Sequence, residues 1–292
     1  MTPDVTIVMA AWQPRRDWLQ TAVSSALGQV GCSVEVVLVD DGSSPPVDRL
    51  LDTTADGRLR LLRLAHGGVA RARNAGGAAA RGRFIRYLDA DDVLEAASTA
   101  RLLELAERDS IAYGTTVVCD QELRPVGAIK CGLEGDLSIP CLLGAFDVRL
   151  SWLFPRGIVE RVGGWDPAFR VCEDWDFVLR AIELADARCD ASPALFYRRH
   201  EASLTRTAGV GEAERAARRV VARYFERHPE LLGSRLERRA LAAVDIDKAL
   251  GYAAARDRRA SLRLMRSAIR RDPLAVLRSA PELAGALARR FR

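Results

Sequence analysis

The sequence lacks several features that would point to particular classes of protein. None of its six cysteines forms a Cys-x-x-Cys pair, so zinc and dithiol redox sites are not indicated, and free thiols in a reducing compartment are expected. No apolar run approaches the roughly 20 residues of a membrane-spanning helix. Residues 1–4 lead into an apolar strand without a basic leader, which predicts no signal peptide.

Three familiar nucleotide-binding and hydrolase motifs are also missing. The sequence has no phosphate-binding Gly-x-x-x-x-Gly-Lys-Ser/Thr loop, no Gly-x-Gly-x-x-Gly after its first strand and no Gly-x-Ser-x-Gly elbow. What is present is typical of a globular protein, because 49% of the 292 residues are hydrophobic and 28% are charged. This length suits one large domain or two fused halves.

The net charge of +5 hides an uneven distribution of charge. The segment from Arg206 to the end holds 21 Lys or Arg and 10 Asp or Glu, a net charge of +11, whereas the remainder carries −6. A solvated, Arg-rich helical face is the favoured interpretation, because acids are interspersed with the bases. Contact with an anionic membrane surface is the alternative. Nucleic acid is not predicted, since no basic-aromatic motif occurs.

Strands alternate with helices over the first 90 residues, which predicts a Rossmann-like, mostly parallel, doubly wound α/β sheet. We divide the chain into a first half (1–92), a second half of the same domain (93–205) and a basic helical C-terminal extension (206–292). The expected strands cover residues 5–9, 34–39, 59–64 and 83–88, and the expected helices cover 17–29, 47–53 and 69–81.

The region after residue 92 has a less regular pattern. Periodicity predicts helices near 94–108 and over 174–185, with short strands near 111–119 and a loop-rich stretch through 150. The C-terminal extension is helical, and its residues 240–272 resemble a single tetratricopeptide-like helical hairpin.

Two acidic clusters directly follow strands. Ligands bind beyond the carboxyl ends of parallel strands, where Asp40-Asp41 and Asp89, Asp91 and Asp92 should lie. Crowded carboxylates repel one another, and Mg²⁺ or Mn²⁺, which also holds substrate phosphates, relieves that repulsion. An isolated Asp-x-Asp would favour a turn before a helix, but two clusters at one edge favour a metal site.

Four other features have both a functional and a structural interpretation. Asp40 or Asp41 would accept a hydrogen bond from a nucleobase or ribose, or would form a strand-ending turn. Trp12 would stack on a base or pack internally, and His200 would bind metal or be an ordinary hydrogen-bonded histidine. For Glu173-Asp174-Trp175-Asp176, a general base and an acidic first helical turn are equally open.

In order and spacing, these segments resemble the family 2 glycosyltransferases, which have the nucleotide-sugar-binding fold called GT-A. The resemblance covers about the first 205 residues; Ala10, Ala11, Trp12 and Gln13 replace the usual residues of the first turn. The segments that carry it are Val36–Ser43 (VVLVDDGS), Gly67–Gly76 (GGVARARNAG), Phe84–Asp92 (FIRYLDADD), Val162–Asp166 (VGGWD), Glu173–Asp176 (EDWD) and Tyr197–Ser203 (YRRHEAS).

The resemblance implies roles for individual residues. Asp91 would be the direct metal ligand, Asp89 would face ribose or metal, and His200 would reach the metal. Asp41 would contact the nucleobase, and Asp174 would be the catalytic base. The other residues expected on the donor side are Ala10, Trp12 and Arg73. The resemblance also implies that residues 1–92 are the nucleotide-sugar-binding half of the domain and residues 93–205 its acceptor-binding half.

The resemblance also implies the reaction. A sugar would move from a nucleoside-diphosphate sugar, of the UDP type, to an acceptor hydroxyl, with Mn²⁺ or Mg²⁺ bound and with inversion at the anomeric carbon. The acceptor would be a glycan, a lipid-linked glycan or a small-molecule glycoside. The Gln-x-x-Arg-Trp segment of processive members is absent, so single transfer is expected. We expect a cytoplasmic protein, with peripheral contact at the membrane inner face left open.

Two alternatives come from other functional classes. A nucleotidyltransferase would need a Gly-rich basic loop after the first strand, which residues 10–16 do not supply. A non-catalytic nucleotide-sugar-binding or scaffold protein would use the helical extension as its working part, and the intact acidic residues argue against it.

Overall fold

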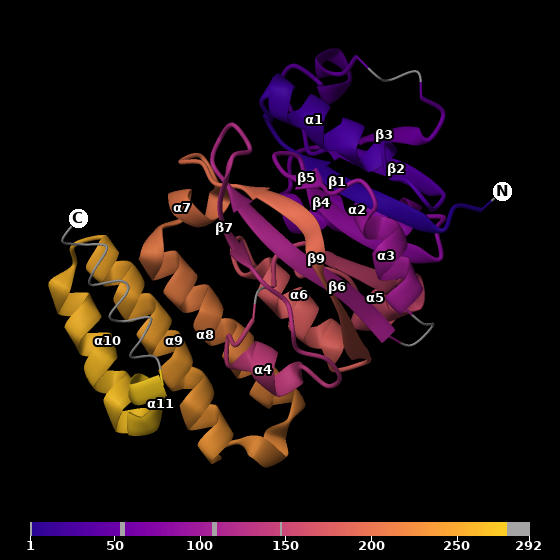
Figure 1. The fold of residues 1–292 in the computed structure, drawn as a ribbon. Helices are drawn as coiled ribbons and strands as arrows, with labels where there is room; N and C mark the ends of the chain where they lie inside the picture. The colour runs from indigo at the N-terminus through magenta and orange to yellow at the C-terminus, as the bar shows by residue number, and fades with distance from the viewer. Residues whose placement is uncertain (1, 53–55, 107–109, 147, 279–292) are drawn as a thin grey trace. The chain divides into compact units, whose positions relative to one another are not determined.

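The computed structural model describes residues 2–52, 56–106, 110–146 and 148–278 (Figure 1). The chain divides into two compact units, of which the first comprises Met1–Ser138 and Phe146–Glu201. The second comprises Ile139–Ala145 and Ala202–Arg292. No described helix has the length and apolarity that crossing a bilayer requires. Parts of three expected elements, residues 53, 107–108 and 279–292, lie outside the described residues.

Four parallel strands form the first half of the sheet in unit 1. They run in the order β3-β2-β1-β4 and have the crossover connections expected from the sequence. All seven residues of β2 are buried, as is typical of parallel strands covered on both faces. The bounds are β1 (Val5–Ala11), β2 (Val34–Asp40), β3 (Leu59–Arg63) and β4 (Phe84–Asp89).

The second half of the sheet is mixed in direction. β8 (Trp152–Pro155) is antiparallel to both β4 and β6 (Ser110–Cys119), and the long β9 (Asp186–Arg198) is parallel to β6. Two short strands complete it: β5 (Val93–Leu94) pairs with β9, and β7 (Pro125–Ile129) pairs with β6. The sheet is therefore parallel where the nucleotide half was predicted and mixed beyond it.

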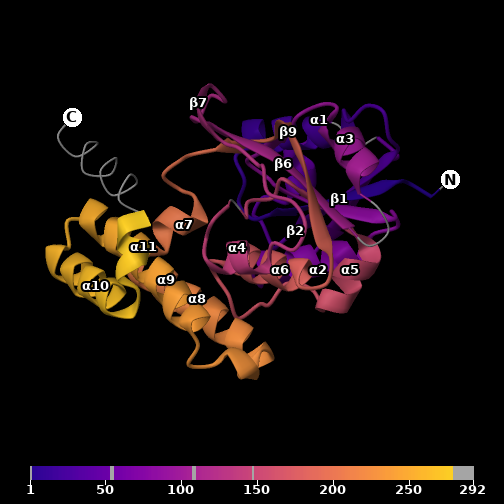
Figure 2. The same cartoon turned by 60° about the horizontal axis from the view of Figure 1, so that its bottom comes forward.

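Helices cover both faces of this sheet (Figure 2). The apolar side of α1 (Arg16–Leu27) and Leu102 of α3 (Ser98–Leu105) pack on one face, which includes Ile7. The other face carries α2 (Val69–Ala79), α5 (Arg156–Val162) and α6 (Glu173–Ile182). A Cβ at Gly76 would lie 2.3 Å from Val8 Cγ1, so α2 approaches β1 as closely as only glycine permits.

Two of the expected elements were wrong in detail. The helix expected near 47–53 is a single 3₁₀ turn, Val47–Leu50. Pro45 and Pro46 precede this turn, and Val47 is its one buried side chain, so no apolar stripe stabilises a longer helix. The stretch expected to be loop-rich contains β7 and the short helix α4 (Ser138–Leu142).

Unit 2 is helical. Its α8 buries an apolar stripe that includes Val221 and Phe225. α9 begins at Ser234, whose side chain accepts from Glu237 N, and α10 begins at Asp257, which caps Ala260 N in the same way. The bounds are α7 (Leu204–Thr207), α8 (Gly209–Arg227), the 3₁₀ turn Pro229–Leu231, α9 (Arg235–Ala254), α10 (Arg258–Arg271) and α11 (Pro273–Arg278).

Candidate active site

The strand register brings the candidate residues of the N-terminal half to one edge. In the parallel pairing, Ala11 lies opposite Asp40, and Ala10 lies between Val39 and Asp89. The residues that follow these strands therefore leave the sheet side by side. Ala10 is the small residue between the two acidic segments.

Asp41 is held in place by a neighbouring loop. Gly67 N donates to its Oδ1 at 2.9 Å and Gly68 N to its Oδ2 at 2.8 Å, while His66 Nδ1 lies 2.9 Å from Oδ2. The indole of Trp12, 57% exposed, stacks on the His66 ring with 4.6 Å between centroids. This end of the edge thus combines a fixed carboxylate with an open aromatic surface.

The neighbouring Asp40 has a structural role. It is buried and accepts hydrogen bonds from Ser43 N at 2.7 Å and from Arg63 Nη1 at 2.7 Å. These contacts close the turn after β2. Of the two acids that follow β2, Asp41 is the one that lies beside an exposed aromatic ring.

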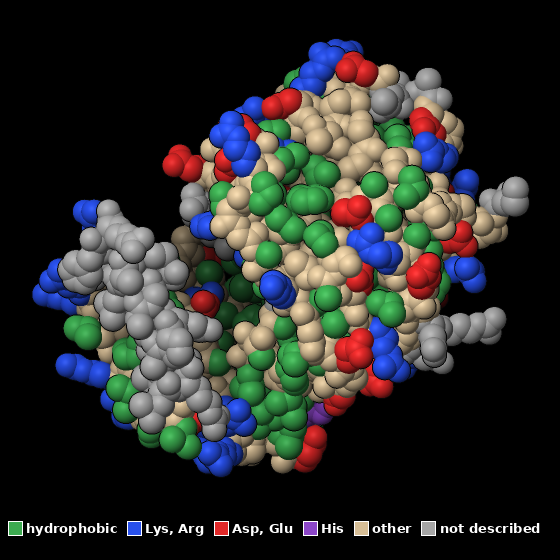
Figure 3. Space-filling view, viewed as in Figure 1, with side chains coloured by type: hydrophobic (Ala, Val, Ile, Leu, Met, Phe, Trp, Pro, Cys, Tyr) green, Lys and Arg blue, Asp and Glu red, His purple; other side chains and the backbone are tan. Residues whose placement is uncertain are grey.

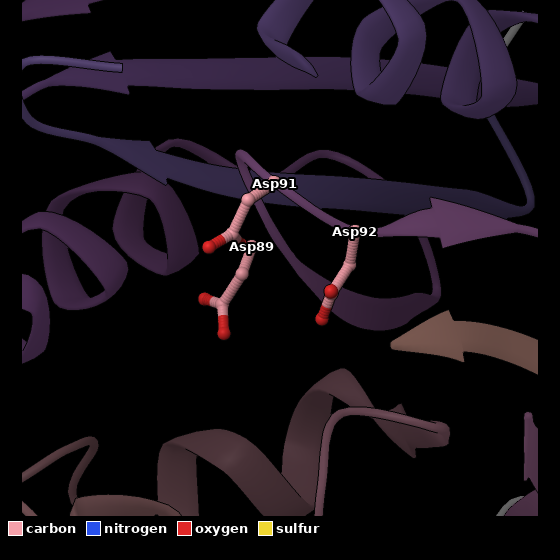
Figure 4. Close-up of side chains that lie close together, drawn as sticks. All are labelled: Asp89, Asp91 and Asp92. Atoms are coloured by element: carbon pink, nitrogen blue, oxygen red, sulfur yellow. The ribbon is translucent and has the colours of Figure 1, made fainter. Parts of the chain in front are cut away.

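Three carboxylates gather after β4, and Figure 4 shows Asp89 and Asp91 together with Asp92 beside them. One oxygen from each lies within 4.8 Å of the others. Burial, followed by the charges of Asp91 and Asp89, raises the pKa of Asp92 well above its usual value. Its Oδ1 accepts from Arg198 N at 2.8 Å. Asp92 is therefore a buried, structural carboxyl, whereas the side chains of Asp89 and Asp91 are 35% and 34% exposed.

His200 lies directly on Asp91. Its Nε2 is 2.7 Å from Asp91 Oδ2, and its Nδ1 has no hydrogen-bond partner among the described residues although it is buried. Arg198 supports the same turn, because its Nε donates to Asp91 O at 2.8 Å. Carboxylate oxygens suit Mg²⁺ or Mn²⁺, so the acidic cluster fits a divalent cation, and His200 lies where it could approach a cation held by Asp91.

Arg73 connects the acidic cluster to α6. It is buried, and its Nη2 donates to Asp89 Oδ1 at 2.6 Å while its Nη1 donates to Glu173 Oε1 at 3.1 Å. The guanidinium also lies over the Trp165 ring, 4.3 Å from the centroid. Burial alone would lower the pKa of Arg73, but the charges of Asp89 and Glu173 outweigh it and raise the pKa. Arg73 therefore stays charged between two carboxylates.

The next residue, Asn74, makes a second connection across the same gap. Its Nδ2 donates to Trp165 O at 2.8 Å, and its Oδ1 accepts from Trp165 N at 2.8 Å. Gly164 has a φ of +80°, and a Cβ there would lie 2.6 Å from Asn74 Oδ1. The Gly-Gly-Trp turn is thus shaped to receive the amide of Asn74.

The first turn of α6 holds three acids in different environments. Cys172, with a φ of +62°, precedes this turn. Asp176 Oδ2 accepts two hydrogen bonds from Arg180, from Nε at 2.9 Å and from Nη2 at 2.6 Å. Asp174 is half-buried, and its Oδ1 accepts from Trp175 N at 2.8 Å. Burial and then the charge of Asp174 raise the pKa of Glu173 to about 7, although Arg73 opposes this.

Replacing Glu173 with glutamine should change how stability depends on pH. A carboxyl whose pKa rises on folding contributes stability below its unfolded value of 4.5, and this contribution is lost as pH rises towards 7. The glutamine side chain does not titrate, so the variant should gain ~3 kcal/mol relative to wild type between pH 4.5 and 8. Urea unfolding at both pH values measures this, without added metal or nucleotide. A constant difference between the two proteins would contradict the raised pKa.

The contacts of three site residues were not predicted from the sequence. His66 and Glu173 become important only through their partners, Asp41 and Arg73, which are 25 and 100 residues away. The side chain of Arg198 donates to backbone carbonyl oxygens of Asp91 and Gln121, contacts that no sequence pattern indicates. The one available signal was His66, a rare histidine beside Gly67-Gly68.

Comparison with known proteins shows a family match and sequence relatives. The family described as Glycosyl transferase family 2 matches residues 6–144. The succinoglycan biosynthesis protein ExoO of Rhizobium meliloti is 33% identical over 226 residues, which are 70% of this chain and 63% of that protein. Residues 6–144 of this chain therefore match glycosyl transferase family 2, and its sequence relatives include proteins named as glycosyltransferases.

Two further proteins resemble this chain, one in sequence and one in fold. The uncharacterized glycosyltransferase EpsJ of Bacillus subtilis is 29% identical over 220 residues, 70% of this chain and 64% of EpsJ. This chain therefore covers less than two thirds of either relative. The crystal structure of S. aureus TarS residues 1–349 in complex with UDP-GlcNAc superposes with a TM-score of 0.61 at 14% identity, covering 90% of this chain and 91% of TarS 1–349. The GT-A-type fold expected from the sequence is confirmed.

Proposed function

We propose that this protein transfers a single sugar from a UDP-sugar to an acceptor hydroxyl, with a divalent cation bound and with inversion at the anomeric carbon. The observation that carries the proposal is the group formed by Asp89, Asp91 and Asp92, whose ligand oxygens lie within 4.8 Å of one another at the carboxyl edge of the parallel strands. TarS, which shares the fold, has been crystallised with UDP-GlcNAc and with UDP, and this supports a uridine donor.

The proposed donor site extends along this edge. Trp12 presents its indole to the base, and Asp41, fixed by Gly67 and Gly68, accepts from the base on the same side. Ala10 leaves room for the ribose between Trp12 and Asp89. Arg73 holds Asp89 in position, because its Nη2 donates to Asp89 Oδ1 at 2.6 Å.

Asp91, Asp89 and His200 are the residues that would hold Mn²⁺ or Mg²⁺. When bound, the cation neutralises charge that develops on the diphosphate leaving group. The protein supplies the orientation: Arg198 fixes the backbone of Asp91, and His200 fixes its carboxylate. Asp92 is buried and its Oδ1 accepts from Arg198 N, so we assign it a structural role beside the cation.

Asp174 is the proposed general base. It lies in the first turn of α6, where backbone N–H groups and the helix dipole favour the ionised carboxylate. The acceptor hydroxyl gives its proton to Asp174 as its oxygen attacks the anomeric carbon, and the C–O bond to the diphosphate breaks on the opposite side. One direct displacement inverts the configuration. Glu173, bonded to Arg73, keeps this turn beside the acidic cluster.

The acceptor and the location are further parts of the proposal. The name of ExoO refers to biosynthesis of a polysaccharide, succinoglycan, which supports a glycan or lipid-linked glycan acceptor; a small-molecule glycoside is the third class. The absence of a Gln-x-x-Arg-Trp segment supports single transfer. We place the protein in the cytoplasm, with peripheral contact at the inner face of the membrane through its basic C-terminal helices.

Nucleotide binding followed by thermal unfolding tests the proposal. UDP at about 100 times its dissociation constant should stabilise the protein by ~2.7 kcal/mol, which corresponds to an increase in Tm of roughly 5 °C. The increase should require Mn²⁺ or Mg²⁺ and disappear with EDTA; GDP and dTDP are the matched controls. Equal shifts with and without the cation would overturn the metal-dependent mechanism. The anomeric configuration of a transferred sugar, read by NMR, tests inversion.

A further inference from the structure

The outward face of α10 has a composition unlike the rest of unit 2. The helix contains six arginines and no acidic residue. Its exposed residues are Arg258, Arg259, Leu262, Arg263, Arg266, Ile269 and Arg270. At 100° per residue these seven positions span an arc of about 140°. The whole exposed face therefore consists of five arginines and two aliphatic side chains.

The two aliphatic side chains lie on the same side of α10, about two helical turns apart. Leu262 and Ile269 are seven residues apart, which places them on one side of the arc about 20° from each other. They are 58% and 47% exposed. In Figure 3, blue and green side chains occupy the left edge of the view, where Figure 1 places α10, and red is absent from the part of that edge that grey atoms leave visible.

The opposite side of α10 accounts for its attachment to the unit. Ala268 packs against Ala242 and Ile246 of α9, and Arg271 Nε lies 3.2 Å from the fully buried Asp245. Folding of the hairpin therefore uses Leu264, Ala268 and Arg271. It makes no use of Leu262 or Ile269, and their exposure is left unexplained by packing.

We propose that this face, the α10 face, binds the surface of an anionic phospholipid membrane. The inference rests on the peripheral membrane contact proposed above and names the surface that makes it. Arginine guanidinium groups pair with lipid phosphates, while Leu262 and Ile269 enter the boundary with the acyl chains. Both kinds of residue on the face are then used. Nucleic acid would use the arginines, but stacking on bases requires aromatic rings, and α10 contains none.

The test is binding of the full-length chain to vesicles of phosphatidylcholine with and without phosphatidylglycerol. Wild type should bind only the anionic vesicles, and salt should weaken the binding. The triple variant Arg259→Gln, Arg266→Gln, Arg270→Gln should bind on the order of 100-fold more weakly, at roughly fivefold per arginine. Replacing the same three residues with lysine should restore binding, because lysine keeps the charge. Leu262→Ser with Ile269→Ser should weaken binding about tenfold while the net charge is unchanged.

A charge-matched control is available on α8 and α9. Arg215→Gln, Arg235→Gln, Arg238→Gln removes the same charge from exposed positions off α10 and should leave binding near the wild-type value. Equal losses in both triple variants would overturn the α10 face, as would unchanged binding by the α10 variant. Binding to duplex or single-stranded DNA in place of vesicles would overturn the membrane as partner.

The two proposals fail in different ways. Absence of vesicle binding by wild type would end the membrane contact and leave the transfer reaction untouched. Release of UDP with a soluble acceptor should be the same in wild type and in every α10 variant. Loss of this release in wild type, with vesicle binding intact, would instead contradict the proposed function.

Discussion

Replacing Asp91 with asparagine should reduce transfer roughly 1,000-fold, because the variant loses the charged oxygen proposed to hold the cation and with it several kcal/mol of transition-state stabilisation. The amide is nearly the same size as the carboxylate and can still bond His200, which lies 2.7 Å from Asp91 Oδ2. Stability should therefore change little. Transfer rates over a range of Mn²⁺ concentrations measure the effect, and weaker activation by the metal should accompany the loss.

Asp92 provides a matched control one residue away. Its carboxyl has a raised pKa and accepts from Arg198 N, and an asparagine oxygen can accept the same hydrogen bond. Asp92→Asn should therefore keep most of the activity and the same metal dependence. A large loss in Asp92→Asn with activity intact in Asp91→Asn would reverse the assignment of the ligands.

Asp174→Asn should lower kcat by a factor of about 10²–10⁴, the usual contribution of a general base. Binding of UDP and Mn²⁺ should be preserved, since Asp174 faces the acceptor in the proposed mechanism. The measurement is kcat with saturating donor, together with the UDP-induced change in Tm. If Asp174→Asn transfers sugar at the wild-type rate, another group takes the proton.

Asp176 lies in the same helical turn and tests whether the effect belongs to position 174. Its buried pair with Arg180 has contacts of 2.6 and 2.9 Å, and breaking such a pair leaves a buried charge uncompensated, at a cost of about 3–5 kcal/mol. Asp176→Asn should therefore lower the free energy of unfolding, while the folded fraction should retain activity. Asp174→Asn should therefore affect catalysis and Asp176→Asn should affect stability, which distinguishes the proposed roles of the two acids.

The parallel half of the fold could be predicted because its strands are buried on both faces. In a strand such as β2 only Glu35 interrupts the run of Val and Leu, and the acids Asp40 and Asp41 mark the end of the strand. The long β9 could not be predicted in this way. Its burial is irregular, Pro193 lies within it, and its pairing with β6 shifts register near Thr115, so the period of two is lost.

Pairings between distant residues were equally hidden in the sequence. The resemblance placed Arg73 on the donor side, but no sequence pattern indicated its two carboxylate partners, one of them 100 residues away. Arg86 is a second case: it lies fully buried in β4 and bonds Ser98, Thr99 and Ala194 O. The sequence does not reveal the partners of a charged residue in an apolar strand. The partners of Arg86 depend on how β4, α3 and β9 pack together.

The adjacent residues Arg73 and Asn74 bond the second half of the domain, so they also restrict which halves can be exchanged between relatives. Asn74 forms hydrogen bonds only with the backbone of Trp165. A grafted acceptor half could therefore form the same hydrogen bonds with any side chain at position 165. Arg73 is more demanding, because it needs an acid at position 173. Chimeras that keep this acid should fold as hybrids, whereas those that lose it would leave Nη1 of the buried guanidinium without its carboxylate partner, with Asp89 as the remaining bonded acid.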